Sequence, residues 1–235
     1  MIPIFILTCD RLESLKKSIQ SYRDCIRSEY ETVIIDFGST YPPTVAFLKQ
    51  IEENGTKVYW KGKISHVTQL NTANTHIQDY FKAHPKSDYV VTDSDIALDA
   101  TQGDVLEVYS HFLETMSIIN VAGPMLRIDD IPDCYPLKEK LLSGKMGFHK
   151  TFHSQKVHSI DYKGSKISYI TAPIDTTFGM YREGSQWARL KRGVRLLAPY
   201  GARHLDWYVD PKNLTPDQAY YMKHAAQNIV NWSKI

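Results

Sequence analysis

The chain has 235 residues, 43% of them hydrophobic, so it is long enough to bury a core of useful size. Its formal net charge of +2 argues against a dedicated nucleic-acid-binding protein, which would carry a strong basic excess. The three cysteines, Cys9, Cys25 and Cys134, are far apart and odd in number, so they offer neither a disulfide framework nor a zinc pattern and favour a reducing compartment.

Residues 1–7 are apolar but too few to span a membrane, and they lack the charged segment that opens a signal peptide. We therefore predict a first strand here. No other apolar run approaches the length of a membrane span. This predicts a cytoplasmic protein, with peripheral contact to the cytoplasmic face of a membrane left open.

Strands and helices alternate over the first hundred residues. Apolar, β-branched runs predict strands at 3–8, 32–36, 57–60 and 89–92. Apolar residues at helical spacing predict helices at 11–28, 43–54 and 67–83. This alternation is typical of a parallel, doubly wound sheet.

After residue 95 the pattern changes. We predict a helix at 105–119, strands at 120–127, 168–173 and 177–182, and an amphipathic helix at 216–232. The segment 128–158 is irregular. Since no repeat, low-complexity tract or linker divides the chain, we predict one α/β domain over 1–235, with a regular half at 1–100 and a looser half at 101–235.

Asp93 and Asp95 follow the strand predicted at 89–92. This is the carboxyl end of a strand, where ligands bind in an open α/β sheet. Two ionised carboxylates this close repel each other, and a divalent cation would hold them together. The alternative is a polar turn after the strand, because Asp and Ser are common turn residues.

Polar residues also end the first two predicted strands. Thr8 and Arg11 follow the first strand, and Asp36 follows the second, where a carboxylate can bind a base edge or ribose hydroxyls. Ser39 and Thr40 favour a turn or a helix cap. The glycine-rich phosphate motifs GxGxxG and GxxxxGK[ST] are absent from the sequence, which disfavours NAD-type and P-loop enzymes.

The segments PIFILTCDR, VIIDFGST and DYVVTDSDIAL, in this order and spacing, resemble the GT-A fold nucleotide-sugar glycosyltransferases, particularly the bacterial family 2-like group with a DxD motif. The resemblance covers the first hundred residues and is loose beyond them. It implies a single GT-A (Rossmann-like) domain with a mainly parallel central sheet and helices on both faces. It also implies a nucleotide-binding half at 1–100 and an acceptor-binding half with a C-terminal helix at 101–235.

The resemblance further implies a metal-dependent enzyme that moves a sugar from a UDP-sugar to a hydroxyl of a glycan or glycolipid acceptor, in surface polysaccharide or glycolipid synthesis. Asp95 would ligate Mn²⁺ or Mg²⁺, and Asp93 would reach the ribose or the metal. Asp36 would contact the uracil or ribose, with Thr8 and Arg11 in the same nucleotide cleft.

The remaining roles fall on residues with an equally simple structural alternative. Asn71 and Asn74 would contact the donor, or form a polar helix face. Asp175 would deprotonate the acceptor in an inverting mechanism, or cap a turn, and a retaining course stays open because the usual Glu-Asp pair is missing. His204 would bind the metal, or would have only a structural role. Asp206 is an alternative metal or acceptor contact.

The stretch 182–203 is rich in Arg and Lys. It predicts a solvated face, a diphosphate contact or a membrane contact, and Trp187, Leu190 and Leu197 fit one helical face weakly. Two other functions also remain open. One is a HAD-type phosphatase or phosphotransferase, whose D-x-D-x-[TV] signature TDSDIA partly matches, and the other is a non-catalytic sugar- or nucleotide-binding module on a GT-A frame.

Overall fold

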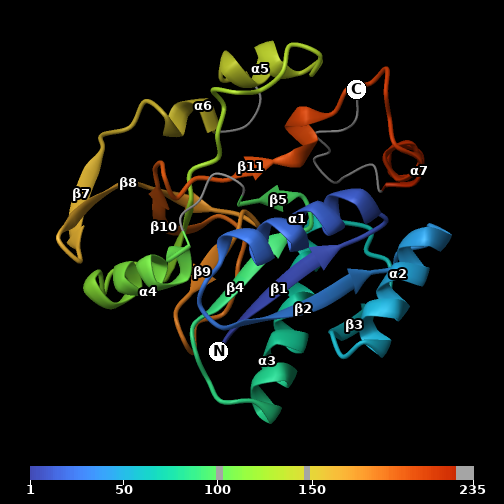
Figure 1. Ribbon diagram of the computed structural model, residues 1–235, viewed down its shortest axis with the longest axis horizontal. Coiled ribbons are helices and arrows are strands. Elements are labelled where there is room, and N and C mark those ends of the chain that lie inside the picture. Colours follow the sequence, from blue (N-terminus) through green and yellow to red (C-terminus); the bar gives the residue numbers. More distant parts are fainter. Residues whose placement is uncertain (99–102, 146–148, 226–235) are drawn as a thin grey trace.

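Strands and helices alternate in the first half of the chain, as the sequence predicts. The computed structural model describes residues 1–98, 103–145 and 149–225 (Figure 1). The first four strands are β1 (Ile2–Thr8), β2 (Tyr30–Phe37), β3 (Lys57–Lys61) and β4 (Tyr89–Asp93). The helices between them are α1 (Leu12–Cys25), α2 (Pro42–Glu53) and α3 (Ala73–Ala83), and a 3₁₀ helix, η1 (Val67–Thr72), precedes α3.

The second half is less regular. Its strands are β5 (Ile96–Ala97), β6 (Val121–Pro124), β7 (His158–Tyr162), β8 (Ser165–Ile174), β9 (Gly179–Tyr181), β10 (Lys191–Leu196) and β11 (Arg203–His204). Its helices are α4 (Val105–Thr115), α5 (Lys138–Leu142), α6 (His149–Phe152), the 3₁₀ helix η2 (Leu205–Tyr208) and α7 (Pro216–His224). Residues 226–232 of the predicted C-terminal helix lie outside the described residues. Within the described ranges, no helix has both the length and the apolar character that crossing a bilayer requires.

Nine strands of the described chain form one sheet in the order β3-β2-β1-β4-β9-β6-β10-β8-β7. Strands β3, β2, β1 and β4 are parallel neighbours, and β6 is parallel to β10. Strand β9 is antiparallel to β4 and β6, and β8 is antiparallel to β10 and β7. All strands of this sheet except β8 and β9 therefore point the same way, which confirms the predicted mainly parallel α/β sheet.

Strand β1 shows why helices cover both faces of this sheet. Successive side chains of a strand point to opposite faces. Ile4 and Ile6 pack in one core cluster with residues of α1, while Phe5 and Leu7 pack in another with residues of α3. Ile4, Phe5 and Ile6 have no exposed surface, so the continuous apolar run in the sequence marks a strand buried on both sides.

The weak helical pattern in the basic stretch is not realised. The segment 191–196 is the strand β10, which lies inside the sheet between β6 and β8. Trp187 is 1% exposed and Leu190 is 52% exposed, so these residues do not form one apolar surface. This removes the helical face that favoured membrane contact.

Gly193 tests the packing of β10. A Cβ atom at this position would lie 2.3 Å from the carbonyl oxygen of Val121 in β6. We expect Gly193→Ala to lower the free energy of unfolding by about 1–3 kcal/mol, because neither backbone can give way freely. Gly62→Ala is the control, since a Cβ there meets no atom within 4 Å and should change stability by less than about 0.5 kcal/mol. Equal urea midpoints for the two variants would contradict the packing.

Candidate functional site

A cavity of about 380 Å³ opens at the carboxyl edge of the parallel strands. Thr8 at the end of β1 lies beside Asp36 of β2, and Leu7 lies beside Asp93 of β4. The three polar motifs that end β1, β2 and β4 therefore meet at one edge of the sheet, as parallel neighbours must. Residues of the second half of the chain complete the lining of the cavity.

A short two-stranded sheet joins the two halves of the chain at this edge. Asp95 lies in the turn between β4 and β5, and β5 pairs antiparallel with β11, so that Ile96 lies opposite His204. The backbone N–H of Leu205 donates to the carbonyl oxygen of Asp95 at 2.7 Å. Asp206 follows in the first turn of η2. Backbone pairing alone thus brings residues far apart in the sequence to one point.

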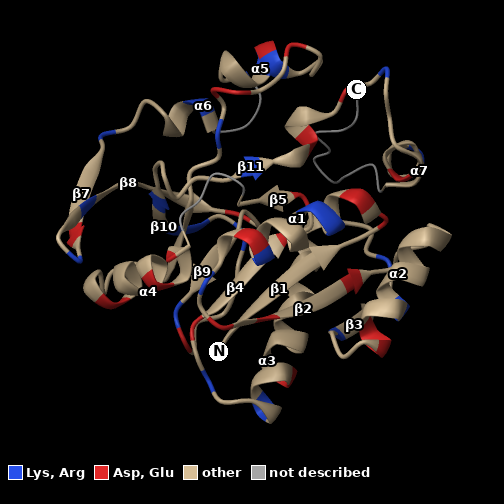
Figure 2. Cartoon of the chain, viewed as in Figure 1, with Lys and Arg blue, Asp and Glu red and all other residues tan. Residues whose placement is uncertain are grey.

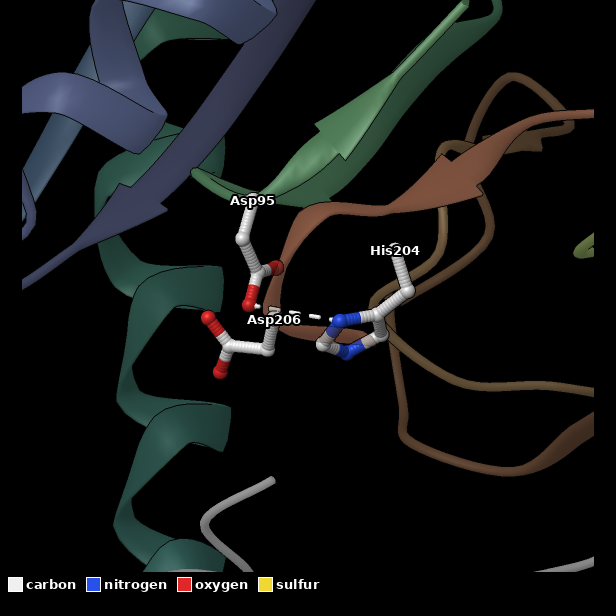
Figure 3. Close-up of side chains that lie close together, drawn as sticks. All are labelled: Asp95, His204 and Asp206. Atoms are coloured by element: carbon white, nitrogen blue, oxygen red, sulfur yellow. Dashed lines mark ion pairs between the residues drawn. The ribbon is translucent and has the colours of Figure 1, made fainter. Parts of the chain in front are cut away.

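Asp95, His204 and Asp206 form a buried cluster at this junction (Figure 3). One ligand atom of each residue lies within 4.8 Å of the other two, and His204 Nδ1 is 3.7 Å from Asp95 Oδ2. Burial lowers the pKa of His204, against the opposing charge of Asp95, so the imidazole is neutral at neutral pH and can act as a ligand. Two carboxylates and a neutral imidazole form a donor set that suits Mn²⁺ and is compatible with Mg²⁺.

The hydrogen bonding of Asp95 fits such an ion. Its Oδ1 atom is buried and has no hydrogen-bond partner among the described residues. A buried carboxylate oxygen without a partner costs free energy, because it has lost its hydration and gained nothing in exchange. A divalent cation held between Asp95 and Asp206 would remove that cost.

Arg11 provides positive charge at the cluster. Its guanidinium contacts the carboxylate of Asp206 and lies 3.2 Å from Asp95 Oδ2. The ring of Tyr221 in α7 covers it at 4.5 Å. Burial acts to lower the pKa of Arg11, but the charge of Asp95, Tyr221 and the charge of Asp93 together outweigh this and raise it. The sequence predicted Arg11 in the nucleotide cleft, and the structure places it on the same carboxylates that would hold a metal.

Helix α7 closes this side of the cavity. The backbone N–H of Glu13, in the first turn of α1, donates to Asp217 at 3.0 Å. The hydroxyl groups of Tyr220 and Thr40 lie 3.1 Å apart. These contacts hold Tyr221 over Arg11, so the C-terminal helix is part of the site.

Asp93 lines the cavity but stands apart from this cluster. Its carboxylate accepts a hydrogen bond from the hydroxyl of Thr176, and its backbone N–H donates to the Thr176 carbonyl at 2.8 Å. Burial, followed by the charge of Asp95, raises the pKa of Asp93 well above its usual range. Asp206, considered from the sequence only as an alternative contact, lies beside Asp95 in the cluster, and a role for Asp93 at the ribose or the metal stays a prediction.

Asp36 is used to build the loop after β2. Its carboxylate accepts from the backbone N–H groups of Gly38 at 3.1 Å and Ser39 at 2.9 Å, and from the Ser39 hydroxyl. Asp36 is 1% exposed and is not among the described residues that line the cavity, although its neighbour Phe37 is. A contact between Asp36 and a base or ribose therefore stays a prediction.

Asn71 and Asn74 also lie outside the described lining of the cavity. The side chain of Asn74 donates to the carbonyl oxygen of Trp187 at 2.8 Å and accepts from the Trp187 N–H at 3.0 Å. This paired contact fixes the start of the basic stretch against α3. The structure therefore gives Asn74 a packing role, and Asn71 lies on the partly exposed η1.

Asp175 lines the cavity and forms an ion pair with Arg189. Both contacts, Arg189 Nε to Asp175 Oδ1 and Arg189 Nη2 to Asp175 Oδ2, measure 2.6 Å. The geometry is bidentate, which is the strong form of this pairing. Asp175 can act as a base only when this pair opens.

The basic stretch 182–203 is divided among separate contacts and runs from the end of β9 through β10 to β11 (Figure 2). Arg182 donates to the backbone carbonyl oxygens of Leu113, in the last turn of α4, and of Ile119, in the segment that follows the helix. Arg203 pairs with Asp130 at 2.6 Å. Arg195 is buried in the wall of the cavity. Sequence reasoning did not distinguish these residues, and it missed Tyr221, because no local pattern shows which partner each side chain meets.

No family model and no curated protein matches this chain. Solved structures that resemble it include the mannosyltransferase PcManGT from Pyrobaculum calidifontis with GDP-Man and Mn²⁺. That match has 16% identity and a TM-score of 0.41, over 55% of this chain and 36% of that one. Another is S. aureus TarS 1–349 with UDP-GlcNAc, with 12% identity and a TM-score of 0.46, over 77% of this chain and 45% of that one.

A third is glucosyl-3-phosphoglycerate synthase from Mycobacterium tuberculosis with Mn²⁺ and UDP-Glc, with 13% identity and a TM-score of 0.34, over 61% of this chain and 49% of that one. All three structures contain a nucleotide sugar. This chain spans less than half of the length of each. Similarity of this extent does not establish an activity.

Cys9 provides a chemical test of the cavity wall. Burial raises the pKa of its thiol to about 12, and the charges of Asp10 and Asp36 act in the same direction. At pH 8 its thiolate fraction is then roughly a thousandfold below that of an ordinary exposed thiol. We expect iodoacetamide to modify the exposed Cys134 long before Cys9. Peptide mass spectrometry over time measures both rates, and equal rates would contradict the buried, acidic surroundings of Cys9.

Proposed function

We propose that this chain is a metal-dependent glycosyltransferase that moves a sugar from a nucleotide diphosphate, with UDP as the expected nucleotide, to a hydroxyl of a glycan or glycolipid. The observation that carries the proposal is the buried cluster of Asp95, His204 and Asp206 at the carboxyl edge of a parallel sheet. The adjoining cavity offers concave space of the size that small-molecule sites have. The three polar strand ends at the same edge support it.

Asp95 and Asp206 would hold Mn²⁺ or Mg²⁺, with the neutral imidazole of His204 as third ligand. When bound, the ion would supply a Lewis acid that offsets the charge gathering on the departing nucleotide. Arg11 would leave these carboxylates and donate to the diphosphate, since its guanidinium suits phosphate oxygens. Asp93, whose raised pKa favours a retained proton, would hydrogen-bond a ribose hydroxyl.

The acceptor hydroxyl needs a base, and we retain Asp175 for this role in an inverting, single-displacement reaction. Arg189 would then act as its positioning residue: it holds the carboxylate in place and releases it when the acceptor enters. A retaining course is the alternative, and NMR of the anomer formed separates the two.

Donor binding tests the metal site. We expect UDP to stabilise the protein only when Mn²⁺ is present, by about 2.7 kcal/mol at a hundredfold excess over Kd. Asp95→Asn should abolish this ligand-induced shift of Tm, because it removes charge from the cluster. Asp129→Asn is the control, since that carboxylate is 71% exposed and pairs only at the surface with Arg127.

UDP-Glc, UDP-GlcNAc and GDP-Man are the first donors to assay, with phosphate esters in parallel. Phosphate release from esters without sugar transfer would favour the alternative function of a HAD-type phosphatase. Metal-dependent UDP binding without any turnover would favour the binding module. No response to any nucleotide would refute the proposal.

The base assignment predicts a second variant. Asp175→Asn should lower kcat by about 10²–10⁴, the range of a lost general base, and leave the UDP-induced shift of Tm unchanged. Arg189→Met should reduce kcat less, since the carboxylate remains. Steady-state kinetics at saturating donor measure both, and an Asp175→Asn variant with normal kcat would assign the base elsewhere.

A further inference from the structure

Arg195 is a buried cation that has no role in the proposed reaction. It lies near the carboxyl end of β10 and is 1% exposed. Its Nε donates to the carbonyl oxygen of Pro173 at 2.9 Å, and its Nη1 donates to the Pro124 carbonyl at 3.0 Å and to the Thr177 hydroxyl at 3.2 Å. The ring of Phe152 lies 5.0 Å from the guanidinium. The side chain is thus held rigidly in the wall of the cavity.

The charge of Arg195 lacks a carboxylate counter-ion in the described part of the chain. The other arginines in the cavity wall, Arg11 and Arg189, are paired with carboxylates. Burial lowers the pKa of Arg195 to about 10, and the charge of Asp175, already paired with Arg189, offsets this only in part. Burying a cation without an opposite charge costs several kcal/mol. The protein keeps such a cation facing a cavity.

Arg182 shows what a purely structural arginine looks like in this fold. It too donates to backbone carbonyl oxygens, but one of these belongs to Leu113 in the last turn of α4, where the helix dipole supplies partial negative charge. It does not line the cavity among the described residues. Arg195 binds carbonyl oxygens at the ends of strands, where the net dipole is small.

The position of Arg195 separates it from the proposed nucleoside end. Strands β9 and β6 lie between β4 and β10, which puts β10 about 14 Å from β4 at the usual strand spacing. The nucleoside end lies at β1 and β2, farther away on the opposite side of β4. The Arg195 end also carries ring side chains in the cavity wall: Phe152 lies 5.0 Å from the guanidinium, and His149 packs edge-on against Phe152 at 5.8 Å. An incoming acceptor would meet this end.

We propose that Arg195 binds an oxyanion, a phosphate or a carboxylate, on the acceptor, and so selects acidic acceptors. The assignment of this anion to the acceptor rests on the proposed function, whereas the anion site itself rests on Arg195 alone. Nε and Nη1 are taken by the contacts to Pro173, Pro124 and Thr177, which leaves the N–H groups of Nη2 to donate to an oxyanion in the cavity. Phe152 covers the group and keeps water from screening its charge.

The test uses inorganic phosphate and malonate as probes, with potassium chloride at equal ionic strength as the reference, in the absence of nucleotide and metal. We expect phosphate, malonate or both to raise the Tm of the wild type and of Arg182→Met, the matched control. Arg195→Met should lose the response. If that variant does not fold, Arg195→Lys decides the matter, because it keeps the charge, loses the contacts that fix the guanidinium and should bind the probe at least tenfold more weakly by ³¹P NMR or calorimetry. The probe that binds more tightly identifies the anion.

A repeat by calorimetry with UDP and Mn²⁺ at saturation distinguishes the two ends of the cavity. The probe should still bind, since UDP would occupy the other end. Displacement of the probe by UDP would overturn the acceptor assignment and give Arg195 to the donor diphosphate. A wild type indifferent to both probes, or an equal response in Arg195→Met, would overturn the anion site. A wild-type protein that binds phosphate but does not bind UDP would refute the proposed transferase function and would still support the anion site.

Discussion

The burial of the Asp95 carboxylate at the end of β4 is the constraint on which the rest of the site depends. A carboxylate removed from water requires a cation or hydrogen-bond donors. Here the chain brings Arg11 to it from β1's end, and the β5–β11 pairing brings His204 and Asp206. Helix α7 then covers Arg11 with Tyr221. One buried charge thus organises elements from both ends of the described chain.

Arg11 and a divalent ion would compete for the same oxygens. Arg11 neutralises the cluster through Asp95 and Asp206, and leaves Asp95 Oδ1 without a partner. An ion between the carboxylates would bind Asp95 Oδ1 and would free Arg11 to contact the anionic donor. The metal and the diphosphate would therefore each increase the affinity for the other. The metal would replace Arg11 at the carboxylates, and the diphosphate would give the freed guanidinium a new anionic partner.

The local pattern of the sequence predicted the first half of the fold well. Period-two and period-3.6 spacing depends on residues close in the chain, and strands β1, β2, β3 and β4 follow it. The second half of the chain depends on pairing between distant segments. Strand β9 lies between β4 and β6, and the central position of β10 in the sheet leaves Arg195 buried. No spacing rule could show that Asp206 joins Asp95, or that Asp36 is occupied by its own loop.

Diffraction at the manganese edge from crystals grown with Mn²⁺ and UDP tests the central claim most directly. The account predicts one anomalous peak bonded to Asp95, His204 and Asp206, with the Arg11 guanidinium moved from these carboxylates onto the diphosphate. Arg11 still bridging Asp95 and Asp206, with no manganese between them, would contradict it.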